Sequence, residues 1–181
     1  MAVKLDNVTG VLSGPEVAET ARTIADLKGI FTNEEARAAL DQALIAYRVQ
    51  AYEPVPEGQE GGIGCATTFL EPGMVGDEYF MTRGHYHAGQ DRPELEVTIS
   101  GEGALVLMDR ERVTRVEPMN AGSVHHVPPG TAHRVANIGN EMLVFVSYWA
   151  SETGHDYQAI RELGFSARVR CIEGKPQLVE A

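Results

Sequence analysis

The sequence predicts an all-β protein folded as a double-sheet jelly roll or small barrel. Short runs rich in β-branched and aromatic residues recur over its central half, and turn residues separate them. The runs are residues 64–71, 78–84, 93–100, 103–109, 112–117, 123–128, 132–137 and 142–149. Strands this short and this closely spaced are typical of jelly rolls and small barrels, which enclose one core.

Two helices are expected before these strands. Residues 13–16 form a capping box with a proline near the first turn, and residues 17–27 repeat apolar side chains at helical spacing until Gly29. A second capping box at 32–35 opens another helix, whose apolar side extends over residues 36–47. Neither helix carries a candidate catalytic group, so both are expected to decorate the barrel.

The other segments are shorter and more mixed. We expect residues 1–12 to be extended, 47–53 to alternate weakly as a strand, 54–64 to form a loop, 156–163 to form a short helix and 166–172 to form a last strand.

The composition is that of an acidic soluble globular protein. Because the formal net charge is −11, nucleic acid and anionic membranes are not expected as partners. Cys65 and Cys171 form neither a disulfide framework nor a C-x-x-C motif, so we expect reduced thiols in a cytoplasmic protein. No apolar run reaches the roughly 18 residues of a membrane span, and the N-terminus lacks the apolar stretch of a signal peptide.

Three histidines and one glutamate are the strongest candidates for a functional site. His85 and His87 lie two residues apart on a predicted strand, so their side chains point to the same face. Glu94 opens the next strand, and His133 follows a rigid Pro-Pro-Gly turn at the start of a later one. Three neutral imidazoles and a carboxylate suit a first-row divalent ion and leave coordination positions open. The sequence therefore predicts one metal ion held by these residues inside the barrel.

Other polar residues near these motifs have more than one candidate role. Glu96 lies two residues beyond Glu94, so both carboxylates should point inward, where they would repel each other. Glu96 is a candidate contact to the metal ligands, a proton-handling group or a solvated rim residue. Of the adjacent His125 and His126, only one can face inward, and it is a candidate contact to the metal ligands or to the substrate rather than a metal ligand.

The spacing of the histidine motifs resembles that of cupins. The second motif, from Gly122 to Asn137, matches at every fixed position, whereas the first lacks its leading glycine. Longer strings resemble the cupin-type glucose-6-phosphate isomerase family of archaea and some bacteria. These strings are residues 66–68 (ATT), 72–76 (PGMVG), 82–87 (TRGHYH), 127–134 (VPPGTAHR), 137–139 (NIG) and 154–157 (GHDY).

The resemblance covers most of the chain and implies a cupin jelly roll with N-terminal helices. We therefore expect a single cupin domain, residues 1–181. It would comprise an N-terminal extension with two helices and a loop (1–63), a jelly-roll core with both metal motifs (64–150) and a C-terminal segment (151–181).

The resemblance also implies a homodimeric, cytoplasmic enzyme that interconverts glucose 6-phosphate and fructose 6-phosphate in glycolysis and gluconeogenesis. It implies one divalent ion per subunit, with Fe²⁺ expected first and Mn²⁺, Zn²⁺ or Ni²⁺ as alternatives. By position, the metal ligands are His85, His87, Glu94 and His133, the residues that hold the phosphate are Thr68, Thr82 and Gly84, and the residues that line the sugar site are His155 and Tyr157.

Two departures from the family pattern affect the sugar pocket. Glu96 stands where the family often has tyrosine. A family tyrosine after the last long strand aligns best with Trp149, although Tyr148 is adjacent. We therefore count Glu96, Tyr148 and Trp149 as candidate substrate contacts, together with Arg83, whose guanidinium suits a phosphate.

Isomerisation of a sugar moves hydrogen between C1 and C2, by proton transfer or by direct hydride transfer. Glu94 is the first candidate base, but a metal ion would lower its basicity, so Glu96 is the local rival. His155 is a candidate for assisting ring opening, with Tyr157 beside it; the alternative is that His155 only shapes the rim of the pocket.

Three other functions fit parts of the same pattern, because a fold alone does not determine a function. An iron dioxygenase would use the same three-histidine, one-glutamate centre. A non-catalytic cupin would bind the sugar without turnover. A related isomerase would act on mannose 6-phosphate. The strings at 66–68 and 154–157 argue against the first two.

Overall fold

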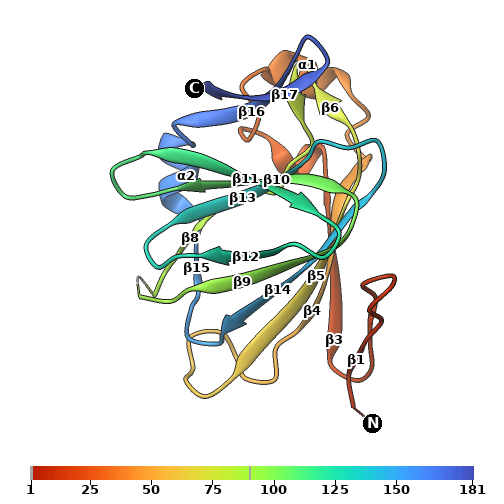
Figure 1. The fold of residues 1–181 in the computed structure, drawn as a ribbon, viewed down its shortest axis with the longest axis vertical. Helices are drawn as coiled ribbons and strands as arrows, with labels where there is room; N and C mark the ends of the chain where they lie inside the picture. The colour runs from red at the N-terminus through yellow and green to blue at the C-terminus, as the bar shows by residue number, and fades with distance from the viewer. Residues whose placement is uncertain (1, 90) are drawn as a thin grey trace.

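The computed structural model describes residues 2–89 and 91–181, and it confirms the all-β fold class (Figure 1). The strands are β1 (Lys4–Leu5), β2 (Leu12–Ser13), β3 (Val17–Thr23), β4 (Ile45–Tyr52), β5 (Ile63–Leu70), β6 (Met74–Val75), β7 (Glu78–Tyr79), β8 (Tyr86–His87), β9 (Glu94–Ser100), β10 (Glu102–Met108), β11 (Thr114–Asn120), β12 (Val124–Val127), β13 (Ala132–Asn137), β14 (Leu143–Ala150), β15 (His155–Asp156), β16 (Ala167–Ile172) and β17 (Lys175–Glu180). The helices are η1 (Ala25–Leu27), α1 (Glu34–Ala39) and α2 (Gln158–Leu163).

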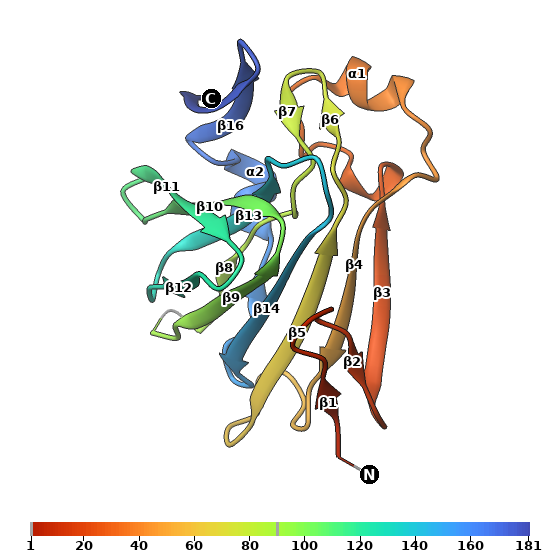
Figure 2. The same ribbon diagram turned by 45° about the vertical axis from the view of Figure 1, so that its right-hand side comes forward.

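Two antiparallel sheets enclose the core. The larger sheet has the order β12-β9-β14-β5-β4-β3, and the smaller has the order β11-β10-β13. Figure 2 shows β10, β11 and β13 on one side of the molecule and β3, β4 and β5 on the other. Alternate residues of the strands point inward, so buried apolar side chains such as Leu105, Leu107 and Phe145 fill the space between the sheets. This is the architecture of a jelly-roll barrel.

The prediction of a helix over residues 17–27 is wrong. Residues 17–23 form β3, which pairs antiparallel with β4. Only Ile24 and Leu27 of the helically spaced apolar residues are buried, and they lie in or beside the short turn η1 that follows the strand. Pairing with β4 satisfies the backbone groups of this segment, and this tertiary interaction overrides the local helical pattern.

The second predicted helix begins where expected but is shorter. The Asn33 side chain accepts a hydrogen bond from the backbone N–H of Ala36 and caps α1. The helix ends at Ala39, and residues 45–52 form β4, as the weak alternation over 47–53 predicted. Because β3 and β4 belong to the main sheet, the N-terminal segment builds the barrel rather than decorating it.

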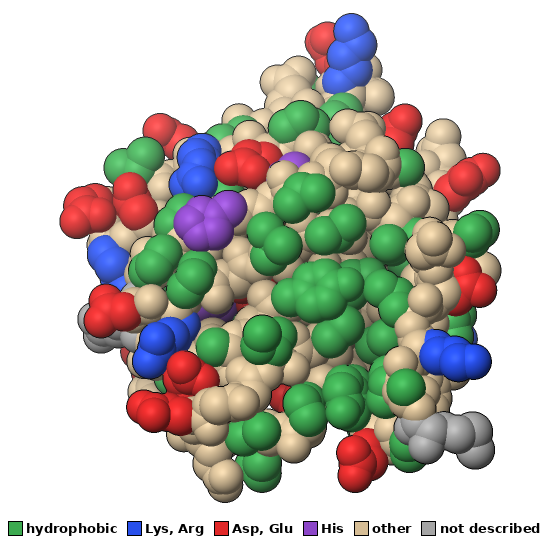
Figure 3. Space-filling view, turned by 60° about the horizontal axis from the view of Figure 1, so that its bottom comes forward, with side chains coloured by type: hydrophobic (Ala, Val, Ile, Leu, Met, Phe, Trp, Pro, Cys, Tyr) green, Lys and Arg blue, Asp and Glu red, His purple; other side chains and the backbone are tan. Residues whose placement is uncertain are grey.

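The outer face of the large sheet is partly covered by the β1–β2 hairpin. The hydroxyl of Thr67 donates to the carbonyl oxygen of Gly10 at 2.6 Å and fixes this hairpin to β5. Away from the hairpin the same face leaves apolar residues in solvent, including Ile63, Leu95 and Val124. Figure 3 shows one face of the molecule on which hydrophobic side chains gather near the centre, with charged side chains around them.

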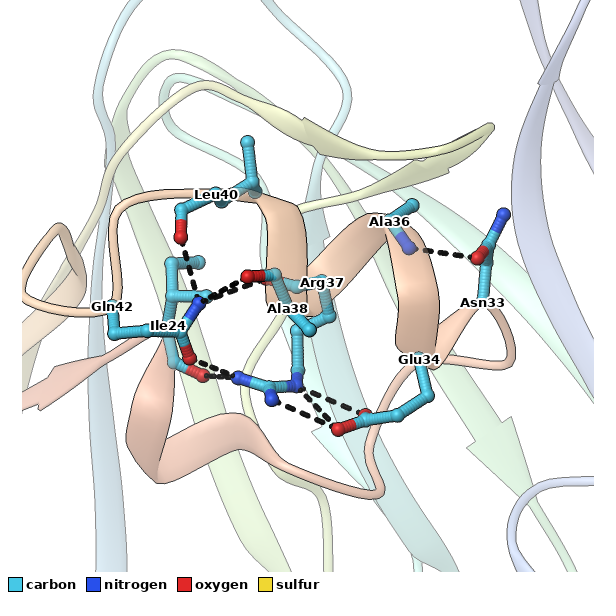
Figure 4. Close-up of polar contacts among 8 residues, drawn as sticks. All are labelled: Ile24, Asn33, Glu34, Ala36, Arg37, Ala38, Leu40 and Gln42. Atoms are coloured by element: carbon cyan, nitrogen blue, oxygen red, sulfur yellow. Dashed lines mark hydrogen bonds and ion pairs between the residues drawn. The ribbon is translucent and has the colours of Figure 1, made fainter.

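A buried arginine fixes the connection between β3 and β4 (Figure 4). The guanidinium of Arg37 donates to the carbonyl oxygen of Ile24 at 2.9 Å and to the side chain of Gln42 at 2.6 Å. It also makes a bidentate ion pair with Glu34, one turn away on the helix. These contacts hold the segment that connects β3 to β4.

The C-terminal segment agrees with the prediction and adds one strand. The expected helix and last strand are α2 and β16, and β17 pairs with β16 through a turn at Glu173 and Gly174, both at positive φ. None of the helices within the described ranges is long and apolar enough to cross a membrane.

We expect Asn137→Ala to destabilise the fold. The fully buried Asn137 amide donates to the carbonyl oxygens of Leu70 and Glu141, and its oxygen accepts from the N–H of Gly139. Removing the side chain leaves these backbone groups unsatisfied, at a cost of about 1–3 kcal/mol in the free energy of unfolding. Chemical denaturation measures this loss. Asn120→Ala, at an exposed position on β11, should change stability little; equal effects of the two substitutions would contradict the prediction.

Candidate metal centre and active site

The structure brings two of the predicted metal ligands together through a backbone pairing. The N–H of His85 donates to the carbonyl oxygen of His133 at 3.2 Å, and the N–H of His133 donates back at 3.0 Å. The two residues are thus directly opposite each other, and their side chains share one face. Their ring centroids lie 4.4 Å apart.

The other two predicted ligands complete a compact group. His87 Nε2 lies 3.1 Å from Glu94 Oε2, and His133 Nε2 lies 3.6 Å from the same oxygen. Together with His85, each residue offers one ligand atom, and these four atoms all lie within 4.8 Å of one another. Residues about forty positions apart in the chain therefore form one candidate metal site, as the sequence predicted.

The environment of the imidazoles fits a metal ligand set. His87 Nδ1 lies 2.7 Å from the carbonyl oxygen of Arg92, which can only accept, so Nδ1 carries a proton and Nε2 is the ring nitrogen directed at Glu94 and available to an ion. His85 Nε2 is buried and has no hydrogen-bond partner within the described residues. A buried, unpaired ring nitrogen beside two others and a carboxylate is what a borderline divalent ion would satisfy.

Burial also sets the protonation of the group. It lowers the pKa of His85 well below its ordinary value, with neighbouring imidazoles acting in the same direction, and it lowers the pKa of His133 to about 4. Burial alone would raise the pKa of Glu94, but interactions with His133 and His87 outweigh it, and the net pKa lies below the ordinary value. Neutral imidazoles and an ionised carboxylate are the forms that bind metal.

Glu96 points into the same interior but lies outside the ligand group. It is buried, and it faces Ser147 on β14. Burial raises its pKa well above the ordinary value, and the charges of Glu94 and Glu117 add to the shift. Its Oε2 has no hydrogen-bond partner among the described residues. Glu94 rather than Glu96 completes the candidate metal site.

A cavity of about 400 Å³ opens beside this group. Nearly all of the predicted site residues line it: Thr68, Thr82, Arg83, Gly84, His85, Glu94, Glu96, His133, Trp149, His155 and Tyr157. Tyr148 does not, because alternation along β14 turns it to the outer face, between Cys65 and Leu95. The structure therefore places Trp149 at the cavity and Tyr148 outside it.

His155 and Tyr157 form the wall of the cavity next to the metal ligands. Their rings stack with centroids 5.9 Å apart, and the ring of His155 lies 4.6 Å from that of His85. His155 Nδ1 lies 2.8 Å from Glu57 Oε1, so the proton on Nδ1 is donated to the carboxylate and Nε2 is left as the free ring nitrogen. Sequence reasoning missed Glu57, because its loop carries no motif spacing.

Hydrogen-bond donors gather around the 82–84 segment. The hydroxyl oxygen of Thr82 accepts from the N–H of Val135 at 3.1 Å, which leaves its O–H free to donate. The buried guanidinium of Arg134 donates to the carbonyl oxygen of Arg83. Because the C=O and N–H of a trans peptide point in opposite directions, this contact turns the N–H of Gly84 away from Arg134.

Gly84 is required at this position for steric reasons. Its φ is +75°, and a Cβ here would lie 2.8 Å from the ring of Phe165 and 3.0 Å from the carbonyl oxygen of His133. The backbone can therefore pass close to both the core and the cavity only with glycine.

Three further cavity residues come from the N-terminal strands, two of them from the segment whose structure was mispredicted. Thr20 and Arg22 lie on β3, and Tyr47 lies on β4. The predicted helix over residues 17–27 placed Thr20 and Arg22 on different faces. The alternation of Ala18, Thr20 and Arg22 was the available signal, and it becomes informative only once β3 is known to be a strand.

Comparison with known proteins points to one enzyme family. The model of the family "Glucose-6-phosphate isomerase (GPI)" matches residues 21–179. The chain is 40% identical over 181 residues to the glucose-6-phosphate isomerase of Thermococcus onnurineus, an alignment that covers 99% of this chain and 94% of that protein. It is 38% identical over 180 residues to the enzyme of Pyrococcus furiosus, covering 98% and 93%. A putative glucose-6-phosphate isomerase 2 of Rhizobium meliloti is 36% identical over 174 residues, covering 94% and 86%.

Among solved structures, the oxalate decarboxylase of Bacillus subtilis is similar to part of the chain. The match has a TM-score of 0.47 and 27% identity, and it covers 58% of this chain and 25% of that one.

We expect His87→Ala to abolish tight metal binding. His87 is buried and directly faces Glu94, so its removal takes one nitrogen from the group of four ligand atoms. Elemental analysis after reconstitution and gel filtration should find about one divalent ion per wild-type chain and almost none in the variant. The exposed His126 on β12 supplies the control: His126→Ala should retain the wild-type ion content. Full occupancy of the His87→Ala variant would contradict the assignment.

Proposed function

Because this chain belongs to the glucose-6-phosphate isomerase family, we propose that it interconverts glucose 6-phosphate and fructose 6-phosphate. The observation that carries the proposal is the cavity itself. It joins a three-histidine, one-glutamate group to a set of hydroxyl, backbone and guanidinium donors; the Arg83 guanidinium uses one N–H on the carbonyl oxygen of Asp26 and keeps the others. The first part suits the hydroxyl and carbonyl oxygens of a sugar, and the second suits a phosphate.

The donors near residue 84 would hold the phosphate. The hydroxyls of Thr68 and Thr82, the N–H of Gly84 and the guanidinium of Arg83 all border the cavity. Each is a donor that can bind a phosphate oxygen, and together they would fix the far end of the substrate. Trp149 and Glu96 would contact the sugar carbons and hydroxyls on the opposite side.

The residues present fit one divalent ion held by His85, His87, Glu94 and His133. Such an ion supplies electrostatic stabilisation of negative charge on the C1 and C2 oxygens. We propose Fe²⁺ as the resident ion, with Mn²⁺, Zn²⁺ or Ni²⁺ as alternatives. The chain itself would orient the sugar, because His85, Glu94 and His133 line the same cavity as the proposed phosphate donors.

Glu94 is our candidate for the group that moves the proton between C1 and C2. Burial opposes ionisation of its carboxyl group, but His133 and His87 outweigh burial and keep the net pKa below the ordinary value, which favours the ionised form that a base requires. The group also borders the cavity. His155 would assist ring opening through its free Nε2, while Glu57 holds the ring in place. Tyr157 stacks on His155 and limits its rotation.

We also propose that the enzyme is a cytoplasmic homodimer. The exposed apolar residues of the large sheet's outer face, among them Ile63, Leu95 and Val124, support an interface between two copies. Cys65 and Cys171 are both free thiols, which supports a reducing compartment.

Metal removal tests the proposed function most directly. The chelated protein should lose conversion of fructose 6-phosphate in a coupled assay, and Fe²⁺ or Mn²⁺ should restore it. Undiminished turnover in a sample shown by elemental analysis to be metal-free would contradict the mechanism. Oxygen uptake without isomerisation would favour a dioxygenase instead.

The Glu94→Gln variant tests the proton-transfer role. We expect it to keep part of its metal, since the amide oxygen remains a ligand, but to lose about 10²–10⁴-fold in kcat. In the wild-type enzyme, deuterium from the solvent should enter C2 of the product, as detected by NMR. Turnover of the variant close to wild type would remove Glu94 from this role, and the absence of deuterium at C2 would support hydride transfer.

A further inference from the structure

Arg22 lies on the interior face of β3, at the end of the cavity where the proposed phosphate donors gather. The strand register pairs Arg22 with Tyr47, and Thr20 with Val49. Val49 pairs in turn with Thr68 on β5. Because side chains of one face recur every second residue, Arg22 lies one pleat, about 7 Å, from the row that contains Thr68.

The positive charges of Arg22 and Arg83 act on the pKa of the same two tyrosines. Both residues line the cavity, although they come from strands and loops about sixty positions apart. Burial raises the pKa of the Tyr47 hydroxyl, and the charges of Arg83 and Arg22 both oppose this rise. The same two charges act on Tyr157. Both positive charges therefore act at the end of the cavity that Tyr47 lines.

The guanidinium of Arg22 has donors to spare. Its one hydrogen bond within the described residues runs from Nη1 to the carbonyl oxygen of its neighbour Ala21, at 3.0 Å. In residues 2–89 and 91–181, no carboxylate lies within ion-pair distance of Arg22 or Arg83, whereas Arg48 pairs with Glu71. An arginine facing a cavity with four unused N–H donors is suited to bind a planar or tetrahedral oxyanion.

The opposite end of the cavity has the opposite charge. Alternate residues of β4 line the cavity from Tyr47 at the arginine end to Ala51, and Glu53 follows just after the strand, at the far end. Glu57, beside His155, lines the same end. A dianionic phosphate would be repelled by these carboxylates and attracted to the arginines. The charge distribution therefore favours one orientation of the substrate in the cavity, with its phosphate at the arginine end.

We propose that Arg22 binds the phosphate group of the substrate together with Arg83, and that it distinguishes phosphorylated sugars from free ones. This inference rests on the proposed function. The second guanidinium supplies charge-assisted hydrogen bonds that a free sugar, with a neutral C6 hydroxyl, does not make. In a protein of net charge −11 it also offsets the repulsion that the surface exerts on an anionic substrate.

The test compares Arg22→Met with Arg48→Met in the metal-loaded enzyme. Arg48 lies on β4 opposite Ala21, beside the Arg22 pair, but faces out of the barrel. For Arg22→Met we expect the KM for fructose 6-phosphate to rise about 10- to 100-fold, the effect of losing charged hydrogen bonds, with kcat changed only a few-fold. Arg22→Lys should lie between, because a lysine keeps the charge but loses the bidentate geometry. Arg48→Met should match the wild type.

Two further readouts separate a phosphate contact from a structural effect. The inhibition constant of inorganic phosphate should rise by a similar factor in Arg22→Met, and the dependence of KM on ionic strength should weaken. Unchanged circular dichroism and melting temperature would show that the barrel is intact. An unchanged KM and phosphate inhibition constant in a folded Arg22→Met variant would overturn the proposal.

Inorganic phosphate also allows a failure of this inference to be distinguished from a failure of the proposed function. If the wild-type enzyme failed to isomerise any sugar phosphate, the proposed function would fall. Calorimetric titration of the metal-loaded wild type and Arg22→Met with inorganic phosphate would still report on the site. Weaker phosphate binding by Arg22→Met than by the wild type would support the role of Arg22 in phosphate binding, and equal binding by the two proteins would refute it.

Discussion

A carboxylate held among three imidazoles in the interior of a barrel constrains much of this structure. Removing an ionised Glu94 from water carries a large penalty unless donors or a cation surround it. The antiparallel pairing of His85 with His133 delivers two of the imidazoles, and the first residue of β9 delivers the carboxylate. A shift of one residue in the register of β9 would turn Glu94 to solvent, so the pairing of the strands and the composition of the site depend on each other.

The cavity beside this group is polarised, although the protein as a whole is strongly acidic. Cationic and neutral donors lie near Gly84, whereas Glu53 and Glu57 lie at the other end. The buried guanidinium of Arg134 sits behind the donor end, over the ring of Phe165, and holds the carbonyl oxygen of Arg83. Charges that line an enclosed space act more strongly than charges dispersed over the surface, because the surrounding dielectric constant is low. Local arrangement rather than net charge therefore governs which ligand fits.

The N-terminal strands β3 and β4 form one wall of the cavity. Without β3 and β4, the large sheet would end at β5 and the cavity would lack Arg22 and Tyr47. The hydrogen bonds of Arg37 set the connection between these strands, far from the metal ligands. The pairing of β3 with β4, and of β4 with β5, sets which of their side chains face the cavity.

The sequence by itself determined the jelly roll and the ligand set. Residues 64–150 alternate regularly enough to predict their main strands, although the run at 78–84 forms only the two-residue β7. The spacing of His85, His87, Glu94 and His133 predicts the candidate metal site, because a two-residue repeat and rigid turns have few alternative geometries. The chain could also be assigned to its family from short strings around these residues.

Only the tertiary structure decided the rest. Residues 17–27 have a helical pattern, but pairing with β4 makes most of them a strand, and so Arg22 enters the cavity. The choice between Tyr148 and Trp149 required the register of β14, and the contact of Glu57 with His155 required a loop to fold back over the site. Pairing across the sheet and closure of loops depend on partners distant in the chain, and local sequence does not contain them.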